Sequence, residues 1–205
     1  LSQKEEIDEK VNDIQKHSHS KTAGEGNSPR PLKEKILSEL IDWIKILTIA
    51  AIGAWLCNTF LLMNTEIPTG SMEDTIPTGS RIISSRVHYW FSDPERGDVI
   101  LFEPPDGDIY PYVKRVIGLP GETVTIIDGL VYINDSSEPL DEPYLKEIPV
   151  GDFGPYVVPE GCYFVMGDNR NHSNDSRYWN NTFVPRDNVY AKALFSYWPR
   201  LFLIN

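Results

Sequence analysis

The sequence predicts a mainly β protein, in which one transmembrane helix precedes an antiparallel β-sheet domain. An uncharged apolar run over residues 46–63 is long enough to cross a bilayer, and no long amphipathic helix follows it. Short runs of β-branched and aromatic residues come next, bounded by glycine and proline, as in strands and turns. We expect a tail over 1–30, an amphipathic segment leading into the membrane helix over 31–63, and an extracytoplasmic domain over 64–205.

The tail is polar and poor in aromatic residues, so it buries too little apolar surface to offset its ordering entropy and is predicted to be disordered. His17 and His19 lie in it, but a metal needs further ligands and no Cys/His cluster accompanies them. We therefore predict no metal and no cofactor. The net charge is −11, and residues 64–205 hold 11 basic and 21 acidic side chains, a net of −10. This acidity argues against nucleic-acid binding.

The apolar run contains eighteen residues, which make about 27 Å of helix, just enough to span a hydrocarbon core. A cleaved signal peptide would have a shorter apolar region nearer the N-terminus. Basic residues are concentrated before the run, and the twenty residues after it contain one, Arg81. The positive-inside rule then predicts a single-pass protein of the cell membrane with a cytoplasmic N-terminus. The four basic residues nearest before the run are Arg30, Lys33, Lys35 and Lys45.

Strand-like runs fill most of the remaining chain. The clearest hairpin joins two β-rich runs through Asp128 and Gly129, the pair that a type I′ turn prefers. Residues 136–155 are rich in proline and glycine and are predicted to form a long surface excursion. Strands are expected within 81–87, 97–105, 110–122, 122–135, 156–169 and 188–199.

Two serines, Ser71 and Ser80, end two copies of the pentapeptide IPTGS. A serine nucleophile needs a base, and His172, near Asp168 and Asp175, makes a Ser-His-Asp triad possible. His172 nevertheless lies in a short polar stretch that is more typical of an exposed loop.

Lysine is the other candidate base. Lys114 lies in an apolar strand beside Arg115, and alternation along a strand predicts that one of the two points inward and the other outward, toward solvent. Burial would lower the pKa of Lys114, so that a neutral amine could accept the serine proton. The pattern alone leaves open that both are ordinary surface residues.

Four segments in order resemble the bacterial type I signal peptidases: PTGSM at 68–72, RGDVILFEPP at 96–105, YVKRVIGLPGE at 112–122 and VPEGCYFVMGDNRNHSNDSRYW at 158–179. The resemblance implies a β-rich catalytic domain at the membrane. It also implies a serine endopeptidase that removes N-terminal signal peptides from exported preproteins. Its partners would be preproteins and the lipid bilayer, and the enzyme is expected to be a monomer.

The resemblance also implies roles for individual residues. Ser71 would be the nucleophile and Lys114 the general base, and the Ser71 N–H and Thr69 hydroxyl would form the oxyanion hole. Around them, Ser173 would orient the lysine, and Asp175 and Arg177 would form a charged pair. Gly167 and Asp168 would shape the adjacent turn. Gly79 would be a turn residue, with Ser80 as its neighbour.

Two other functions compete with this interpretation. A repressor-type self-cleaving protease shares the Ser/Lys pair but predicts a soluble chain with a DNA-binding domain. A membrane-anchored β-domain that only binds a partner predicts that Ser71 and Lys114 are dispensable. The chain also departs from the family pattern, since Asp74 stands where a proline is usual, which leaves the rigidity of the loop after Ser71 open.

Overall fold

The computed structural model describes residues 32–73 and 75–205, so the prediction for the tail and the two histidines lies outside the described residues. The chain divides into two compact units, 1–50 and 51–205. Helix α2 (Leu32–Leu56) continues into a π-helical turn, η1 (Cys57–Leu61). In the described part of the chain, Lys35–Leu61 is the one helical segment long and apolar enough to cross a membrane, judged by length and composition.

The helical segment ends two residues before the predicted boundary. Leu62 and Met63 already belong to strand β1 (Leu62–Glu66), where they pair with Ser85 and Ser84. Apolar composition favoured helix at these two positions, but backbone pairing with a neighbouring strand decides the structure there.

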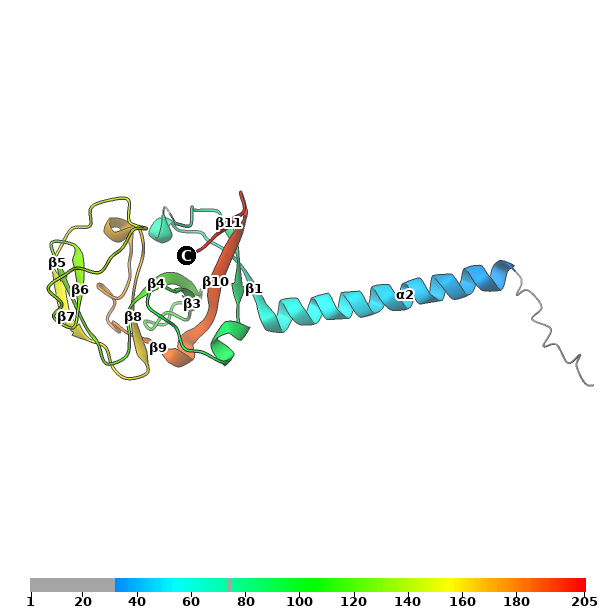
Figure 1. Ribbon diagram of the computed structural model, residues 1–205, viewed down its shortest axis with the longest axis horizontal. Coiled ribbons are helices and arrows are strands. Elements are labelled where there is room, and N and C mark those ends of the chain that lie inside the picture. Colours follow the sequence, from blue (N-terminus) through cyan, green and yellow to red (C-terminus); the bar gives the residue numbers. More distant parts are fainter. Residues whose placement is uncertain (1–31, 74) are drawn as a thin grey trace, which may run out of the picture. The chain divides into compact units, whose positions relative to one another are not determined.

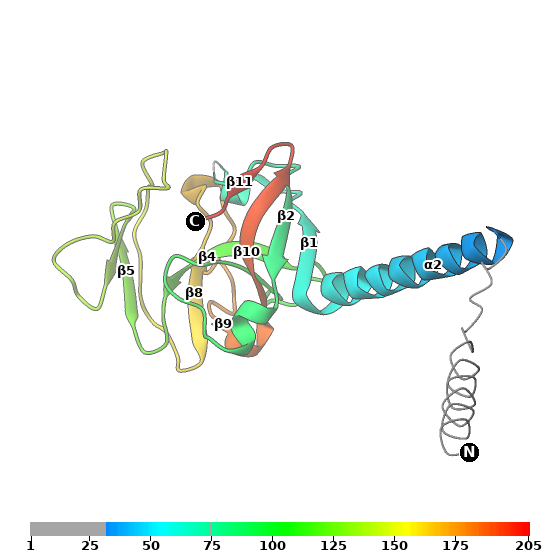
Figure 2. The same ribbon diagram turned by 45° about the vertical axis from the view of Figure 1, so that its right-hand side comes forward.

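The larger sheet has eight strands, and all its pairings are antiparallel. Figure 2 shows β1, β2 and β10 side by side. The spatial order is β1, β2 (Arg81–Ser85), β10 (Val189–Trp198), β3 (Val99–Phe102), β4 (Tyr112–Gly118), β8 (Cys162–Met166) and β9 (Val184–Pro185), with β11 (Phe202–Leu203) beside β10. Four short 3₁₀ helices lie in the connections: η2 (Gly70–Met72), η3 (Val87–Trp90), η4 (Arg170–His172) and η5 (Arg186–Asn188).

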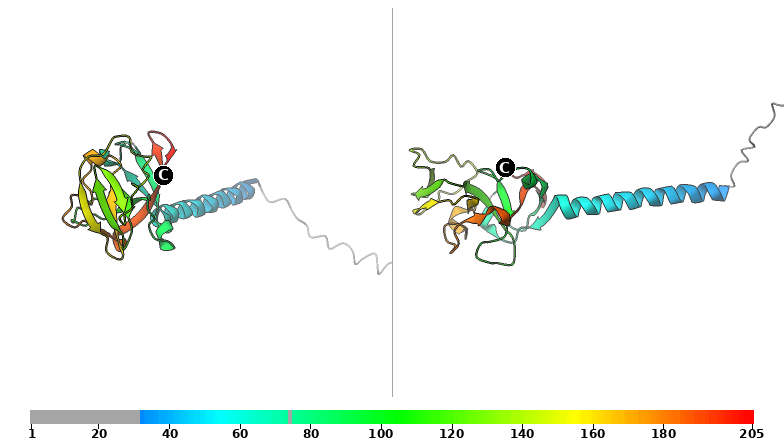
Figure 3. Two further views of the ribbon diagram at one scale, coloured as in Figure 1. Left: turned by 60° about the vertical axis from the view of Figure 1, so that its left-hand side comes forward. Right: turned by 90° about the horizontal axis from the view of Figure 1, so that it is seen from below.

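A smaller sheet lies apart from β1 and β2 within the same domain (Figures 1 and 3). Its order is β6 (Leu130–Ile133), β5 (Thr123–Ile127) and β7 (Phe153–Val157). The predicted hairpin is confirmed, because Asp128 and Gly129 both have positive φ, 50° and 78°.

Two sequence predictions near this sheet were wrong. Strand β7 begins inside the segment predicted as a surface excursion, and the single strand predicted over 156–169 is broken between Val157 and Cys162. In β7, backbone pairing with β5 overrides the glycine and proline at 154 and 155. The break is made by Pro159 and Gly161, which shape a turn in which Cys162 N donates to Pro159 O.

The central strands are buried on both faces. In β3, Val99 and Leu101 pack into one apolar cluster, whereas Ile100 and Phe102 pack into a second. Strand β4 is covered in the same way, so Lys114 and Arg115 are only 4% and 1% exposed. The expectation that one of the two side chains faces solvent is therefore wrong. Alternation places the two side chains on opposite faces of β4, but other parts of the domain cover both faces.

Gly118 offers a test of this packing. A methyl group at this position would lie 2.5 Å from Val124 Cγ2 and 3.0 Å from both Phe164 Cβ and Val158 Cγ2. We expect Gly118→Ala to lower the free energy of unfolding by about 1–3 kcal/mol, because the crowded core must shift. Denaturant unfolding of the detergent-solubilised chain measures this. Gly53→Ala is the control, because a methyl there meets no atom within 4 Å; equal effects would contradict the packing.

Candidate active site

The site begins at the tight turn that follows β1. Ser71 lies in η2, and Glu73 N and Ile76 N donate to Gly70 O and Met72 O at 3.1 and 2.7 Å. The Met72 side chain is 1% exposed and belongs to a core cluster, so it anchors the turn in the domain. Ser71 itself remains partly exposed.

The two IPTGS copies lie side by side but differ in environment. Ile67 N donates to Ser80 O at 2.9 Å, and Gly79 N donates to Ile67 O at 2.8 Å. Gly79 has φ 78°, as a turn glycine requires. Ser80 is fully buried, and its Oγ has no hydrogen-bond partner among the described residues. The structure therefore gives Ser80 no base and no access to solvent.

Strand β4 brings Lys114 to Ser71. Nζ of Lys114 lies 2.6 Å from Oγ of Ser71, within hydrogen-bond distance. Burial lowers the pKa of Lys114 from 10.5 to about 8, although the carboxylates of Asp175 and Asp168 act in the opposite direction. Arg177 contributes to the lowering. A substantial share of this amine is therefore neutral at mildly alkaline pH.

Ser71 and Lys114 open onto a cavity of about 560 Å³. Its lining includes residues 65–72, with Thr69 among them, and residues 110–114. His172 also lines the cavity and is exposed. The partner of the Ser71 hydroxyl is Lys114, so the triad with His172 that the sequence allowed has no support from the geometry.

The turn at 167–172 packs directly against the serine. Asn169 donates its backbone N–H to Ser71 O at 3.1 Å and its side-chain amide to Gly70 O at 2.9 Å. A Cβ on Gly167 would lie 2.3 Å from Ser71 O and from Ser173 Oγ. Glycine is required at 167 by this close approach. Asn169 was missed by the sequence reasoning, which had no signal for a contact 99 residues apart.

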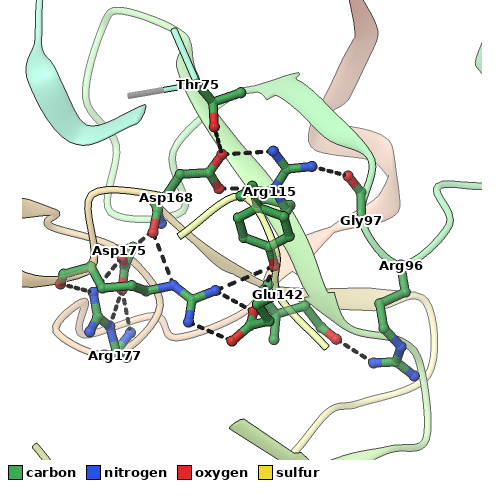
Figure 4. A network of polar contacts seen from close by, with 12 residues as sticks. Thr75, Arg96, Gly97, Arg115, Glu142, Asp168, Asp175 and Arg177 are labelled. Carbon is green, nitrogen blue, oxygen red and sulfur yellow. Dashed lines mark hydrogen bonds and ion pairs between the residues drawn. The ribbon is translucent and has the colours of Figure 1, made fainter. Parts of the chain in front are cut away.

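Two buried ion pairs surround the turn (Figure 4). Asp168 accepts two hydrogen bonds from Arg115, at 2.9 and 2.7 Å, and one from Thr75 at 2.5 Å. Asp175 accepts two from the guanidinium of Arg177, at 2.8 and 2.9 Å, one from the backbone N–H of Arg177 at 3.3 Å and one from Gly167 N at 3.0 Å.

The sequence reasoning paired Asp175 with Arg177 as the structure does. It missed Arg115 and Thr75 as partners of Asp168. The signal available was the position of Arg115 in an apolar strand, where a buried cation requires a carboxylate partner.

Ser173 differs from expectation. Its side chain is buried, at 6% exposure, but its Oγ has no hydrogen-bond partner among the described residues. The expected bond to Lys114 is not formed in this structure, and Ser173 Oγ instead packs against Gly167. Within the same residues, no group of three or more His, Cys, Asp or Glu side chains could hold a metal. Asp74 lies outside the described residues.

A serine hydroxyl within hydrogen-bond distance of a buried lysine amine is an arrangement that serine hydrolases can use as nucleophile and base. Residues 40–198 match the family model "Signal peptidase, peptidase S26". A signal peptidase I of Leptolyngbya laminosa is 38% identical over 178 residues, covering 83% of this chain and 86% of that protein. A probable signal peptidase I-1 of Synechocystis is 39% identical over 180 residues, covering 84% and 88%.

A solved signal peptidase I from Enterococcus faecalis V583 has 39% identity, covers 49% of this chain and 97% of that chain, and has a TM-score of 0.43. The family match and the identities show that the chain belongs to the signal peptidase I family, peptidase S26, and is a serine endopeptidase that removes signal peptides from preproteins. The repressor-type protease and the binding-only domain are set aside by this membership.

The Arg115–Asp168 pair leads to a prediction. Asp168→Asn would leave the buried Arg115 cation without its carboxylate, so we expect the free energy of unfolding to fall by about 3–5 kcal/mol. Asp93→Asn is the matched control, because the Asp93 side chain that pairs with Arg186 is 80% exposed; its loss should stay within about 1 kcal/mol. Denaturant unfolding at neutral pH compares the two, and equal losses would contradict the importance of the buried pair.

Proposed function

We propose that Ser71 and Lys114 carry out the cleavage of signal peptides. The observation that carries this proposal is the 2.6 Å separation between Lys114 Nζ and Ser71 Oγ on the wall of a cavity. Ser71 Oγ attacks the carbonyl carbon of the scissile bond while its proton passes to the neutral Lys114 amine. The resulting ammonium then protonates the leaving amine, and water hydrolyses the acyl-enzyme by the same route.

The oxyanion of the tetrahedral intermediate needs hydrogen-bond donors. We assign this role to the backbone N–H of Ser71 and the hydroxyl of Thr69. Thr69 precedes η2 in an extended conformation, and both residues line the cavity. The position of these groups on the cavity wall supports the assignment.

Asp168, Asp175, Arg177 and Ser173 are assigned supporting roles, because none of them is on the cavity wall. Asp168 and Asp175 fix the turn that contacts Ser71, and Arg115 and Arg177 balance their charges. For Ser173 we keep the predicted role of orienting the lysine as a proposal.

The substrate proposal is an exported preprotein whose cleavage site lies extended in the cavity. The proposed arrangement in the membrane is a single pass through Lys35–Leu61, with the N-terminus in the cytoplasm and the β-domain outside. In support, the apolar window of this segment is not buried against the described part of the chain, and basic residues precede it. Serine and lysine come from one chain, which fits a monomer.

Ser71 and Ser80 form a matched pair for testing the nucleophile. Ser71→Ala should abolish cleavage of a preprotein by the detergent-solubilised chain, with a loss of at least about 10³-fold, because no oxygen remains to attack. Lys114→Ala should give a similar loss. Ser80→Ala should retain activity within a few-fold. A fully active Ser71→Ala variant, or an inactive but folded Ser80→Ala variant, would contradict the proposal.

The dependence on pH tests the base. Because the reactive form of Lys114 is the neutral amine, kcat/KM should rise with pH and level off above about 8, the pKa of this buried lysine. Below that pH, the rate should fall tenfold per pH unit. Single-turnover cleavage between pH 6 and 10 measures this when chemistry limits the rate. A profile that is flat from pH 6, or that rises only near 10.4, would contradict a buried neutral lysine.

A further inference from the structure

One segment outside the four family motifs contacts the turn at 167–172, which packs against Ser71. Residues 140–150, here called the strap, connect the smaller sheet with the turn at 167–172. At one end, Leu140 N donates to Val131 O at 2.7 Å in β6. At the other, Val150 N donates to the side chain of Asn171 at 3.1 Å. The strap is therefore fixed to both structures.

The middle of the strap carries two side chains that contact buried arginines. Glu142 accepts hydrogen bonds from both terminal nitrogens of Arg170, and the side chains of this ion pair are 2% and 5% exposed. Tyr144 places its ring 3.9 Å from the guanidinium carbon of Arg115 and donates its hydroxyl to Glu142 at 2.6 Å. Figure 4 shows Glu142 in the same network of polar contacts as Arg115 and Asp168.

The ring of Tyr144 lies over the guanidinium of Arg115, whose N–H groups already donate hydrogen bonds to other partners. Arg115 uses Nε and Nη2 for Asp168, and Nη1 donates to Gly97 O and Asn205 O at 2.7 and 2.9 Å. What remains is the flat face of the guanidinium, where an aromatic ring binds favourably and excludes water.

Arg115 is connected to the nucleophile by a short chain of contacts. It holds Asp168, and the next residue, Asn169, makes two hydrogen bonds to Gly70 O and Ser71 O. Asp168 also accepts from Thr75, beyond the nucleophile turn. If Arg115 lost its fixed position, Asp168 would no longer be held. The contacts of Asn169 and of Thr75, on either side of the Ser71 turn, would then weaken.

We propose that Tyr144 is a positioning residue for the reaction: its ring seals the face of Arg115 and so holds Asp168, Asn169 and the Ser71 turn in their reactive arrangement. This inference rests on the proposed roles of Ser71 and Lys114. Tyr144 does not line the cavity, so its effect falls on the rate of the chemical step and not on substrate binding.

The charges around Lys114 determine the direction in which the rate–pH profile should shift when Tyr144 is replaced. The carboxylates of Asp168 and Asp175 raise the pKa of Lys114, Arg177 lowers it, and the Tyr112 ring lies 5.5 Å from Nζ. When Arg115 no longer pairs tightly with Asp168, that carboxylate attracts the Lys114 ammonium more strongly. The pKa of Lys114 then rises, and the activity profile moves to higher pH.

The experiment compares Tyr144→Leu with Tyr144→Phe in the full-length, detergent-solubilised chain. We expect Tyr144→Leu to lower kcat for preprotein cleavage about thirtyfold, the rate equivalent of a desolvated cation–π contact, with KM within about twofold. Its rate–pH profile should shift to higher pH. Tyr144→Phe keeps the ring and should stay within about twofold in kcat. Tyr190→Leu is the control, since its hydroxyl bonds only to Glu103 among the described residues and the side chain is 41% exposed.

Each outcome separates the alternatives. Wild-type kcat and pH profile in Tyr144→Leu, even with a lower melting temperature, would reduce Tyr144 to a packing role and overturn the proposal. Equal losses in the Phe and Leu variants would assign the effect to the hydroxyl and Glu142, and would also overturn it. If Tyr144→Leu fails to fold, Tyr144→Met carries the same comparison. Ser71→Ala in the same assay reports on the proposed function independently: its inactivity, beside an unaffected Tyr144→Leu, would refute this inference alone.

Discussion

The Arg115–Asp168 ion pair is the interaction on which the site depends. It joins strand β4, which carries Lys114, to the turn that contacts Ser71. The same carboxylate holds Thr75, beyond the nucleophile turn. Ser71 and Lys114, the proposed reacting pair, are 43 residues apart in the sequence. The Arg115–Asp168 ion pair joins the two segments that lie beside them. A buried ion pair contributes little net stability compared with a well-packed apolar contact, but its geometry is demanding and fixes one arrangement.

Glycine, rather than charge, makes the approach of the two turns possible. At Gly167 the carbonyl of Ser71 and the hydroxyl of Ser173 occupy the space that any side chain would need. Asn169 then completes the contact with two hydrogen bonds to the nucleophile turn. The loop after Ser71, which lacks the usual proline, is held instead by contacts: Glu73 accepts from Thr78, and Thr75 donates to Asp168.

The sequence was sufficient for the elements whose structure depends on local chemistry. The Asp128-Gly129 hairpin, most strands and the apolar helix follow from turn residues and hydrophobic patterning. The Ser71 and Lys114 candidates came from motifs in register. What the sequence could not give were contacts between distant segments. Tyr144 over Arg115, Asn169 on Ser71 and the burial of both Lys114 and Arg115 all depend on which elements cover β4.

The two ion pairs also explain how the pKa of Lys114 can be lowered to about 8 beside two carboxylates. Asp168 and Asp175 are needed to shape the turn, yet each of them favours the charged form of Lys114. Each is matched by an arginine that is itself buried, Arg115 and Arg177. The carboxylates thus keep their hydrogen bonds to Thr75 and Gly167 while much of their charge is balanced locally. Desolvation of Lys114 can then outweigh the remaining attraction, which is the condition that a lysine base requires. In the proposed mechanism, the arginines act through this charge balance and do not contact the reacting atoms.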